Sequence, residues 1–239
     1  MLCCSGGARL DLGTVTIDDC RAYLRTFLNG PGKAGNYSQY EAMQEYLSHD
    51  PRRRDRTVNG LCLSLAVLWL VRCRRNPDLP ATTRLDPMRS TSDLVPAVNV
   101  QATYEKTMAE VIQDGLEAHD HVWRFKRALR LVHLEPREVK KIGHLTNDVD
   151  TLKRVLIEHP YVLLSLSAPF RGGHALGMYV QRARSRYLRS RVLIFDANMG
   201  EFSVRLPRLS DFLKVYQALW KQIVGYEWSE VHAIKCEST

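Results

Sequence analysis

The sequence predicts an α+β fold in which a helical first half packs on an antiparallel β-sheet formed by the second half. Up to about residue 146, apolar residues recur mainly at helical spacing. After Asn147 the pattern changes to short apolar or alternating runs that are typical of strands. The 239 residues, of which 45% are hydrophobic, are enough to bury one sizeable core.

The helices of the first half are predicted from apolar stripes and from the residues that begin and end them. Thr16 is a candidate N-cap, and Asn76-Pro77 ends the helix that Cys62 begins. Residues 76–98 hold four prolines and are predicted to be a connection. Periodicity leaves 122–132 open between helix and strand. The predicted helices are 16–29, 38–47, 62–75 and 101–118.

The second half is predicted to alternate strands with two further helices. Asn147 and Ser210 are the candidate N-caps of helices 148–158 and 211–223. The predicted strands are 161–167, 174–181, 190–196, 201–206 and 231–235.

Two of these strands predict a hairpin because they flank a polar, arginine-rich connection. With the connection centred near residues 185 and 186, His174 faces residue 197 and Asp196 lies beside it. We therefore expect His174 and Asp196 to be neighbours, although a shift of one residue would change the face that they share.

The formal net charge of +8 is concentrated in arginine-rich clusters at 52–56, 72–75 and 182–191. Aromatic residues do not interleave with these arginines, so solvated faces are favoured and no nucleic-acid partner is expected. An anionic membrane surface or an acidic protein stays open as a partner.

Export and membrane signals are weak in this sequence. The longest apolar run, Leu61–Val71, has 11 residues, about half of the roughly 20 that a membrane-spanning helix needs. The N-terminus lacks the long apolar segment of a signal peptide, and the six cysteines show no paired spacing. We therefore expect neither Sec export nor a disulfide framework, and a reducing compartment is favoured.

Three short motifs carry the residue types of a cysteine nucleophile, its base and the group that orients the base. Cys62 opens the apolar helix, His174 follows two glycines at the start of a strand, and Asp196 ends the next strand. A thiolate is the nucleophile, an imidazole can hold the thiol deprotonated, and a carboxylate fixes the imidazole tautomer. The motifs therefore predict a cysteine protease.

Each candidate also has a structural interpretation. Free cysteine is often simply buried, but the start of a helix lowers a thiol pKa and supplies N–H donors for an oxyanion, which favours catalysis by Cys62. Asp196 also suits a turn, and the two roles are compatible. His119 and His121 lack a second pair of ligands, so no metal site is predicted.

Together the motifs resemble the YopT/AvrPphB family of papain-like cysteine proteases, effectors that bacteria inject into animal or plant cells. The resemblance runs from about residue 55 to 206 and depends on the joint order and spacing of three segments. These segments are Gly60-Leu61-Cys62 with the Trp-containing helix that follows, Gly173-His174-Ala175-Leu176-Gly177, and Phe195-Asp196-Ala197-Asn198-Met199-Gly200-Glu201-Phe202.

The resemblance implies a papain-like fold in which Cys62, His174 and Asp196 take the nucleophile, general base and orienting roles. Asn59 is the candidate for the side-chain donor to the oxyanion that the family places a few residues before the nucleophile. We expect no cofactor and no metal. Residues 1–50 are expected to pack as a segment with helices on a protease domain at 51–239, in one folding unit.

The family precedent also implies a setting and a substrate class. The chain is expected to leave the bacterium, through a type III system, and to cleave a small GTPase or a cytoplasmic kinase in the host cytoplasm or at the host plasma membrane. Two alternatives stay open: a deamidase or acyltransferase effector that uses the same three residues, and a non-catalytic basic binding module with the same fold.

Overall fold

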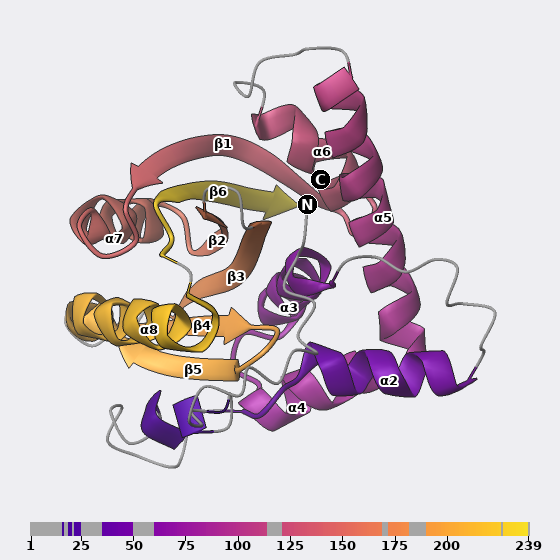
Figure 1. The fold of residues 1–239 in the computed structure, drawn as a ribbon, viewed down its shortest axis with the longest axis horizontal. Coiled ribbons are helices and arrows are strands. Elements are labelled where there is room, and N and C mark those ends of the chain that lie inside the picture. The colour runs from indigo at the N-terminus through magenta and orange to yellow at the C-terminus, as the bar shows by residue number, and fades with distance from the viewer. Residues whose placement is uncertain are drawn as a thin grey trace.

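Helices and one six-stranded sheet make up the described part of the chain in the computed structural model (Figure 1). The structure describes residues 16, 19–20, 22–24, 35–49, 60–113, 121–168, 172–181, 190–225 and 227–238. Helices fill most of the first half and the strands lie in the second half, so the predicted α+β organisation is confirmed.

The sheet has the strand order β1-β6-β2-β3-β4-β5, and each neighbouring pair is antiparallel. The prediction missed β1, which carries charged residues along much of its length because it is an edge strand that faces solvent. The other five strands were predicted to within a few residues. The strands are β1 Leu134–Gly143, β2 Tyr161–Ala168, β3 Gly172–Gln181, β4 Arg191–Asp196, β5 Gly200–Arg205 and β6 Glu230–Ser238.

The α-helices confirm most of the predicted helical ranges. The helix that Cys62 begins has the predicted bounds, and 121–130 is a helix where periodicity had left two choices. The α-helices are α2 Gln39–His49, α3 Cys62–Arg75, α4 Ala81–Leu85, α5 Thr91–Gln113, α6 His121–Arg130, α7 Val149–Glu158 and α8 Leu209–Val224. None of the helices among the described residues has the length and apolar character to cross a membrane.

The predicted connection at 76–98 is wrong, because helices begin inside it. Pro80 is the N-cap of α4, and Pro87 lies in the first turn of a short 3-10 helix, η2 Asp86–Arg89. A proline in these positions removes no helical hydrogen bond, so it starts a helix instead of preventing one. Helix α5 begins at Thr91 and not near residue 101, so Pro96 lies inside it.

The predicted N-caps had mixed outcomes. The Thr16 cap is confirmed, since the Asp19 backbone N–H donates to Thr16 Oγ1 at 3.1 Å and the Thr16 N–H donates to Asp19 Oδ2 at 2.8 Å. Asn147 is replaced by Asp148, one residue later. Ser210 lies inside α8, because the 3-10 helix Leu206–Arg208 leads directly into it.

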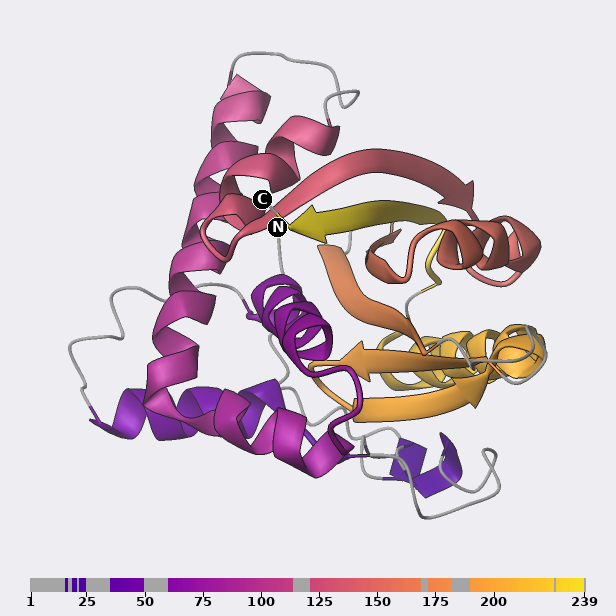
Figure 2. The same cartoon turned by 180° about the vertical axis from the view of Figure 1, so that it is seen from behind.

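The sheet is covered on both faces. Helix α3 lies between one face and the long helix α5, whereas α7 and α8 cover the other face (Figures 1 and 2). Alternate residues of β3 enter the two cores: Ala175 and Tyr179 face α3, and Leu176 and Met178 face α7 and α8. Whether a catalytic residue of β3 faces one helical layer or the other therefore depends only on whether its residue number is odd or even.

Helix α3 packs very closely on β3. A Cβ added at Gly177 would lie 2.6 Å from Trp69 Cε3, so the absence of a side chain there allows the contact. Trp69 also stacks on Phe195 of β4, with ring centroids 5.7 Å apart and planes 13° apart. These contacts fix the position of α3, and with it the position of Cys62 at its first residue.

A buried ion pair joins the helical layer to the edge strand β5. Arg84 of α4 donates to both carboxylate oxygens of Glu201, through Nη2 at 2.6 Å and Nε at 3.0 Å, and Trp69 Nε1 donates to Oε2 at 2.7 Å. The Arg84 and Glu201 side chains are 3% and 1% exposed. A buried charge that loses its partner costs far more than an exposed one, so this pair should be sensitive to substitution.

We expect Glu201→Gln to lower the free energy of unfolding by about 3–5 kcal/mol, because it leaves the Arg84 guanidinium buried without a counter-ion. Urea denaturation followed by circular dichroism measures the change. The matched control is Glu237→Gln, which breaks an exposed pair in which Arg137 Nε lies 2.7 Å from Glu237 Oε2 and should cost less than about 1 kcal/mol. Equal losses in the two variants would contradict this account.

Candidate active site

Cys62 is the first residue of α3 and is 3% exposed. Gly60, two residues earlier, has φ 129°, a backbone conformation that favours glycine and brings the chain sharply into the helix. The first turn of α3 contains no acidic residue, and its last turn contains Arg72, Arg74 and Arg75. The positive end of the helix dipole at Cys62 is therefore not neutralised by its own helix.

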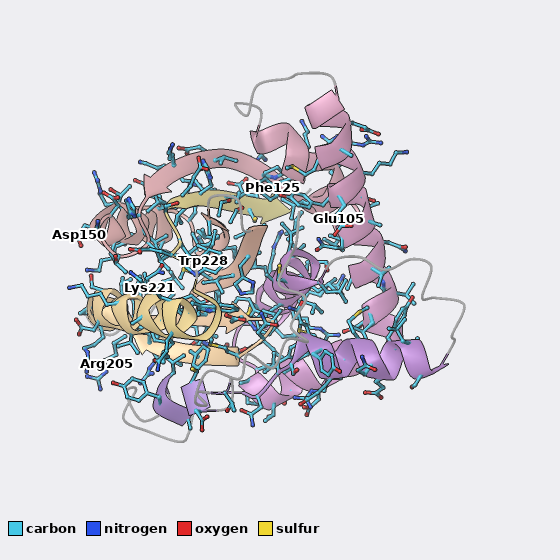
Figure 3. The ribbon with its side chains drawn as sticks, viewed as in Figure 1. Glu105, Phe125, Asp150, Arg205, Lys221 and Trp228 are labelled. Carbon is cyan, nitrogen blue, oxygen red and sulfur yellow. The ribbon has the colours of Figure 1, made fainter. Side chains whose placement is uncertain are left out.

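His174 lies on β3 with its side chain fully buried. It shares the face of Leu176, as predicted, and that face packs against α8 and the segment after it. The imidazole packs against two tryptophans that also contact each other, with ring centroids 5.0 Å from Trp220 and 6.0 Å from Trp228. Figure 3 shows Trp228 inside the molecule beside the strands. Two large rings thus restrict the orientation of the imidazole.

The register of the β3–β4 hairpin differs by one residue from the prediction. Asp196 pairs with Leu176 and not with Ala175. Because side chains alternate between faces, this register puts Asp196 on the same face as Leu176 and His174, whereas the predicted one would have put it on the opposite face. The proximity of His174 and Asp196 is therefore confirmed, and its geometric basis is corrected.

His174 Nε2 lies 3.2 Å from Asp196 Oδ2, with both side chains 0% exposed. The direction of the ring N–H falls outside hydrogen-bond geometry, so the contact is an ion-pair distance. Nδ1, the other ring nitrogen, has no hydrogen-bond partner among the described residues. A buried polar atom without a partner is rare in proteins.

Further donors hold both oxygens of the Asp196 carboxylate. The backbone N–H groups of Asn198 and Met199 donate to Oδ1 at 2.6 and 3.3 Å, so the turn after β4 wraps around the carboxylate. The hydroxyl of Tyr216, on α8, donates to Oδ2 at 2.7 Å. Complete burial by itself favours the neutral acid, but attraction to His174 and these hydrogen bonds lower the pKa of Asp196 below its ordinary value.

Gln39 connects the residue before Cys62 to the same turn. Its backbone N–H donates to the Ala197 carbonyl at 2.7 Å, and its Nε2 donates to Asn198 Oδ1 at 2.6 Å. Its Oε1 accepts the backbone N–H of Leu61 at 3.0 Å. One buried amide thus ties the start of α3 to the turn that begins at Asp196.

The sheet is open at this point. Among the described residues, β4 pairs with β3 only from Leu176 onward, so the part of β3 that carries His174 has no partner on that side. The turn after Asp196 and the Gln39 amide lie beyond the end of this ladder. The structure thus brings His174 of β3 and Asp196 of β4 into contact, and Gln39 links the residue before Cys62 to the turn after Asp196.

Two residues of this site were not predicted. Tyr216 has the spacing of an ordinary core residue of α8, and Gln39 stands 23 positions before the nucleophile, so neither had a local signal. Asn59 and the arginines at 182–189 lie outside the described residues, so the roles expected for them stay predictions. Within the described ranges, no group of three or more His, Cys, Asp and Glu side chains could hold a metal ion.

The other described cysteines are free and buried. Burial raises the pKa of Cys20 to about 11 and that of Cys236 to about 12. Burial also raises the pKa of Cys73 well above its ordinary value, although the charge of Arg84 partly opposes it. These three thiols are therefore poor nucleophiles near neutral pH.

Comparison with known proteins agrees with this fold. No curated protein sequence matches the chain. The crystal structure of the Pseudomonas avirulence protein AvrPphB superposes with a TM-score of 0.59 at 18% identity, over 77% of this chain and 95% of that one, which shows the same papain-like fold. The sequence profile of the peptidase C58 family, described as Yersinia/Haemophilus virulence surface antigen, matches residues 38–234. The chain therefore belongs to the peptidase C58 family of cysteine peptidases.

Proposed function

We propose that this chain is a bacterial effector protease that cleaves a host-cell protein with Cys62 as nucleophile, His174 as general base and acid, and Asp196 as the orienting group. The observation that carries the proposal is the buried His174–Asp196 pair at 3.2 Å, whose Nδ1 has no partner among the described residues. Gln39 ties the start of the Cys62 helix to the same turn. Family membership supplies the reaction class.

In the proposed reaction, His174 Nδ1 takes the thiol proton, and the Cys62 thiolate attacks the carbonyl carbon of the scissile peptide bond. The imidazolium then gives this proton to the leaving amine, which departs and leaves a thioester on Cys62. A water molecule, deprotonated by His174, hydrolyses the thioester and releases the acid product. Asp196 stabilises the imidazolium in both halves of the cycle through the contact at Nε2.

Two finer parts of the proposal come from the family. The substrate is a small GTPase or a cytoplasmic kinase of the host, reached after secretion, and Asn59 supplies the side-chain donor to the oxyanion. The substrate class is tested by adding the active chain or Cys62→Ala to host lysate and identifying new protein N-termini by mass spectrometry. New termini that depend on Cys62 are expected, and a side-chain mass change of about one unit without cleavage would indicate a deamidase instead.

Iodoacetamide at near-neutral pH should alkylate Cys62 well before the other described cysteines. The start of α3 and the His174 imidazole favour the Cys62 thiolate, whereas burial raises the pKa of Cys20, Cys73 and Cys236. Peptide-resolved mass spectrometry over a time course gives the rate at each site. Equal rates at Cys62 and Cys73, which lie on the same helix, would remove Cys62 as the activated thiol.

Asp196→Asn should keep the fold but lower turnover by about 10³- to 10⁴-fold. The N–H groups of Asn198 and Met199 require an oxygen at the Oδ1 position, so the amide nitrogen of the variant must face His174. Nε2 then has to accept a hydrogen bond, the ring proton moves to Nδ1, and Nδ1 no longer accepts the thiol proton.

Steady-state hydrolysis and thermal unfolding of the Asp196→Asn variant measure the two parts of this prediction. Asn198→Ala is a useful control, because it keeps the backbone donor to Asp196 and removes the side-chain contact with Gln39. Turnover by Asp196→Asn within tenfold of the parent would remove Asp196 from the catalytic residues.

A further inference from the structure

The Oδ2 atom of Asp196 has two partners that come from different elements of the fold. His174 Nε2 lies 3.2 Å away on β3, and the Tyr216 hydroxyl donates from α8 at 2.7 Å. The phenol is thus the closer of the two, and it shares its acceptor atom with the imidazole. A side chain that shares an oxygen with the catalytic base can affect how that oxygen supports the base.

The position of Tyr216 is fixed from several directions. Its ring is 0% exposed and packs against Phe212 and Trp220, with centroids 6.1 and 6.2 Å away. Trp220 in turn contacts the His174 ring. The hydroxyl therefore sits in an aromatic cluster that also restrains the imidazole, so its direction toward Asp196 is set by the core of the protein.

A buried carboxylate needs donors to stay ionised, and the donors on Oδ1 are backbone groups that no side-chain substitution removes. On Oδ2, the Tyr216 phenol keeps its proton and donates throughout, while the charge of the imidazole at Nε2 changes as Nδ1 gains and loses its proton. His174 from β3 and Tyr216 from α8 are the titratable groups that contact Asp196 in the described part of the chain.

We propose that Tyr216 is a positioning residue for the proposed proteolytic reaction, which keeps the Asp196 carboxylate ionised and its Oδ2 directed at His174 throughout the cycle. This inference rests on the proposed function. Tyr216 touches neither the substrate nor the thiol in this role and acts entirely through Asp196. It follows that Tyr216 should affect the pH range of activity and the turnover number more than the binding of substrate.

Tyr216→Phe keeps the ring contacts and removes one donor. Because a hydrogen bond to a charged group is worth about one to two pKa units, the acid limb of kcat/KM should move up by about one pH unit. We also expect kcat to fall about tenfold while KM stays within about twofold. Hydrolysis of a short peptide across the acid range measures all three quantities. The pH dependence of Cys62 alkylation by iodoacetamide gives the same limb without a substrate.

Tyr37→Phe is the matched control. Its hydroxyl is also buried and donates a hydrogen bond of 2.9 Å, but the acceptor is the Met88 carbonyl and not Asp196. Both variants should lose similar thermal stability, and only Tyr216→Phe should shift the acid limb. Replacing Tyr216 with 3-fluorotyrosine keeps its shape and strengthens the donor, so it should move the acid limb to lower pH.

The outcomes separate this inference from the proposed function. Loss of hydrolysis in Cys62→Ala supports the proposed protease activity. If the parent protein shows no hydrolysis that depends on Cys62, the proposed function is overturned. The pH profile of Cys62 alkylation would still test the role of Tyr216. The inference is overturned if the acid limb of the Tyr216→Phe variant coincides with that of the parent or lies at lower pH. It is also overturned if Tyr37→Phe moves the acid limb by the same amount. If Tyr216→Phe does not fold, an unchanged limb in the 3-fluorotyrosine variant overturns it.

Discussion

The buried charge of Asp196 is the constraint from which the rest of the site follows. A carboxylate at 0% exposure carries a desolvation cost of several kcal/mol unless donors surround it. The turn after β4 provides backbone N–H groups for one oxygen, and β3 and α8 provide His174 and Tyr216 for the other. Because the donors come from separate elements, satisfying the carboxylate also fixes how those elements sit relative to one another. Helix α8 and the β3–β4 hairpin thus both contact one ionised group.

Polar contacts extend this constraint to the helical layer. The Gln39 amide holds the start of α3 against the turn that carries Asp196, and the Arg84–Glu201 pair holds α4 against β5. The close packing of Trp69 on Gly177 and Phe195 already places α3 on the sheet. Hydrogen bonds and a bidentate ion pair are directional. They define where the first residue of α3 lies, whereas the surrounding core supplies most of the stability.

The sequence was sufficient for features with local signals. Helix α3 could be predicted to the residue because an apolar run ends at Asn76-Pro77. The hairpin was predicted with a register error of one residue, since counting through 182–189 assumes a symmetric connection. Strand β1 was missed because its charges suit an exposed edge. Pro80 and Pro87 were misleading because they begin helices. Tyr216 and Gln39 had no local signal, because their roles depend on partners 20 and 22 or more positions away.

The same separation in sequence explains why the site forms only when several elements of the fold are in place together. Gln39 and Asn198 are 159 positions apart, and Gln39 contacts the residue before Cys62 at the same time. In the proposed mechanism, Cys62 is activated only when α3, the β3–β4 hairpin and α8 are all in place, because each contributes a group that another element orients. A partly folded chain would therefore contain an ordinary thiol. In the proposed mechanism, the reactivity of Cys62 therefore depends on the assembled fold as well as on the start of α3.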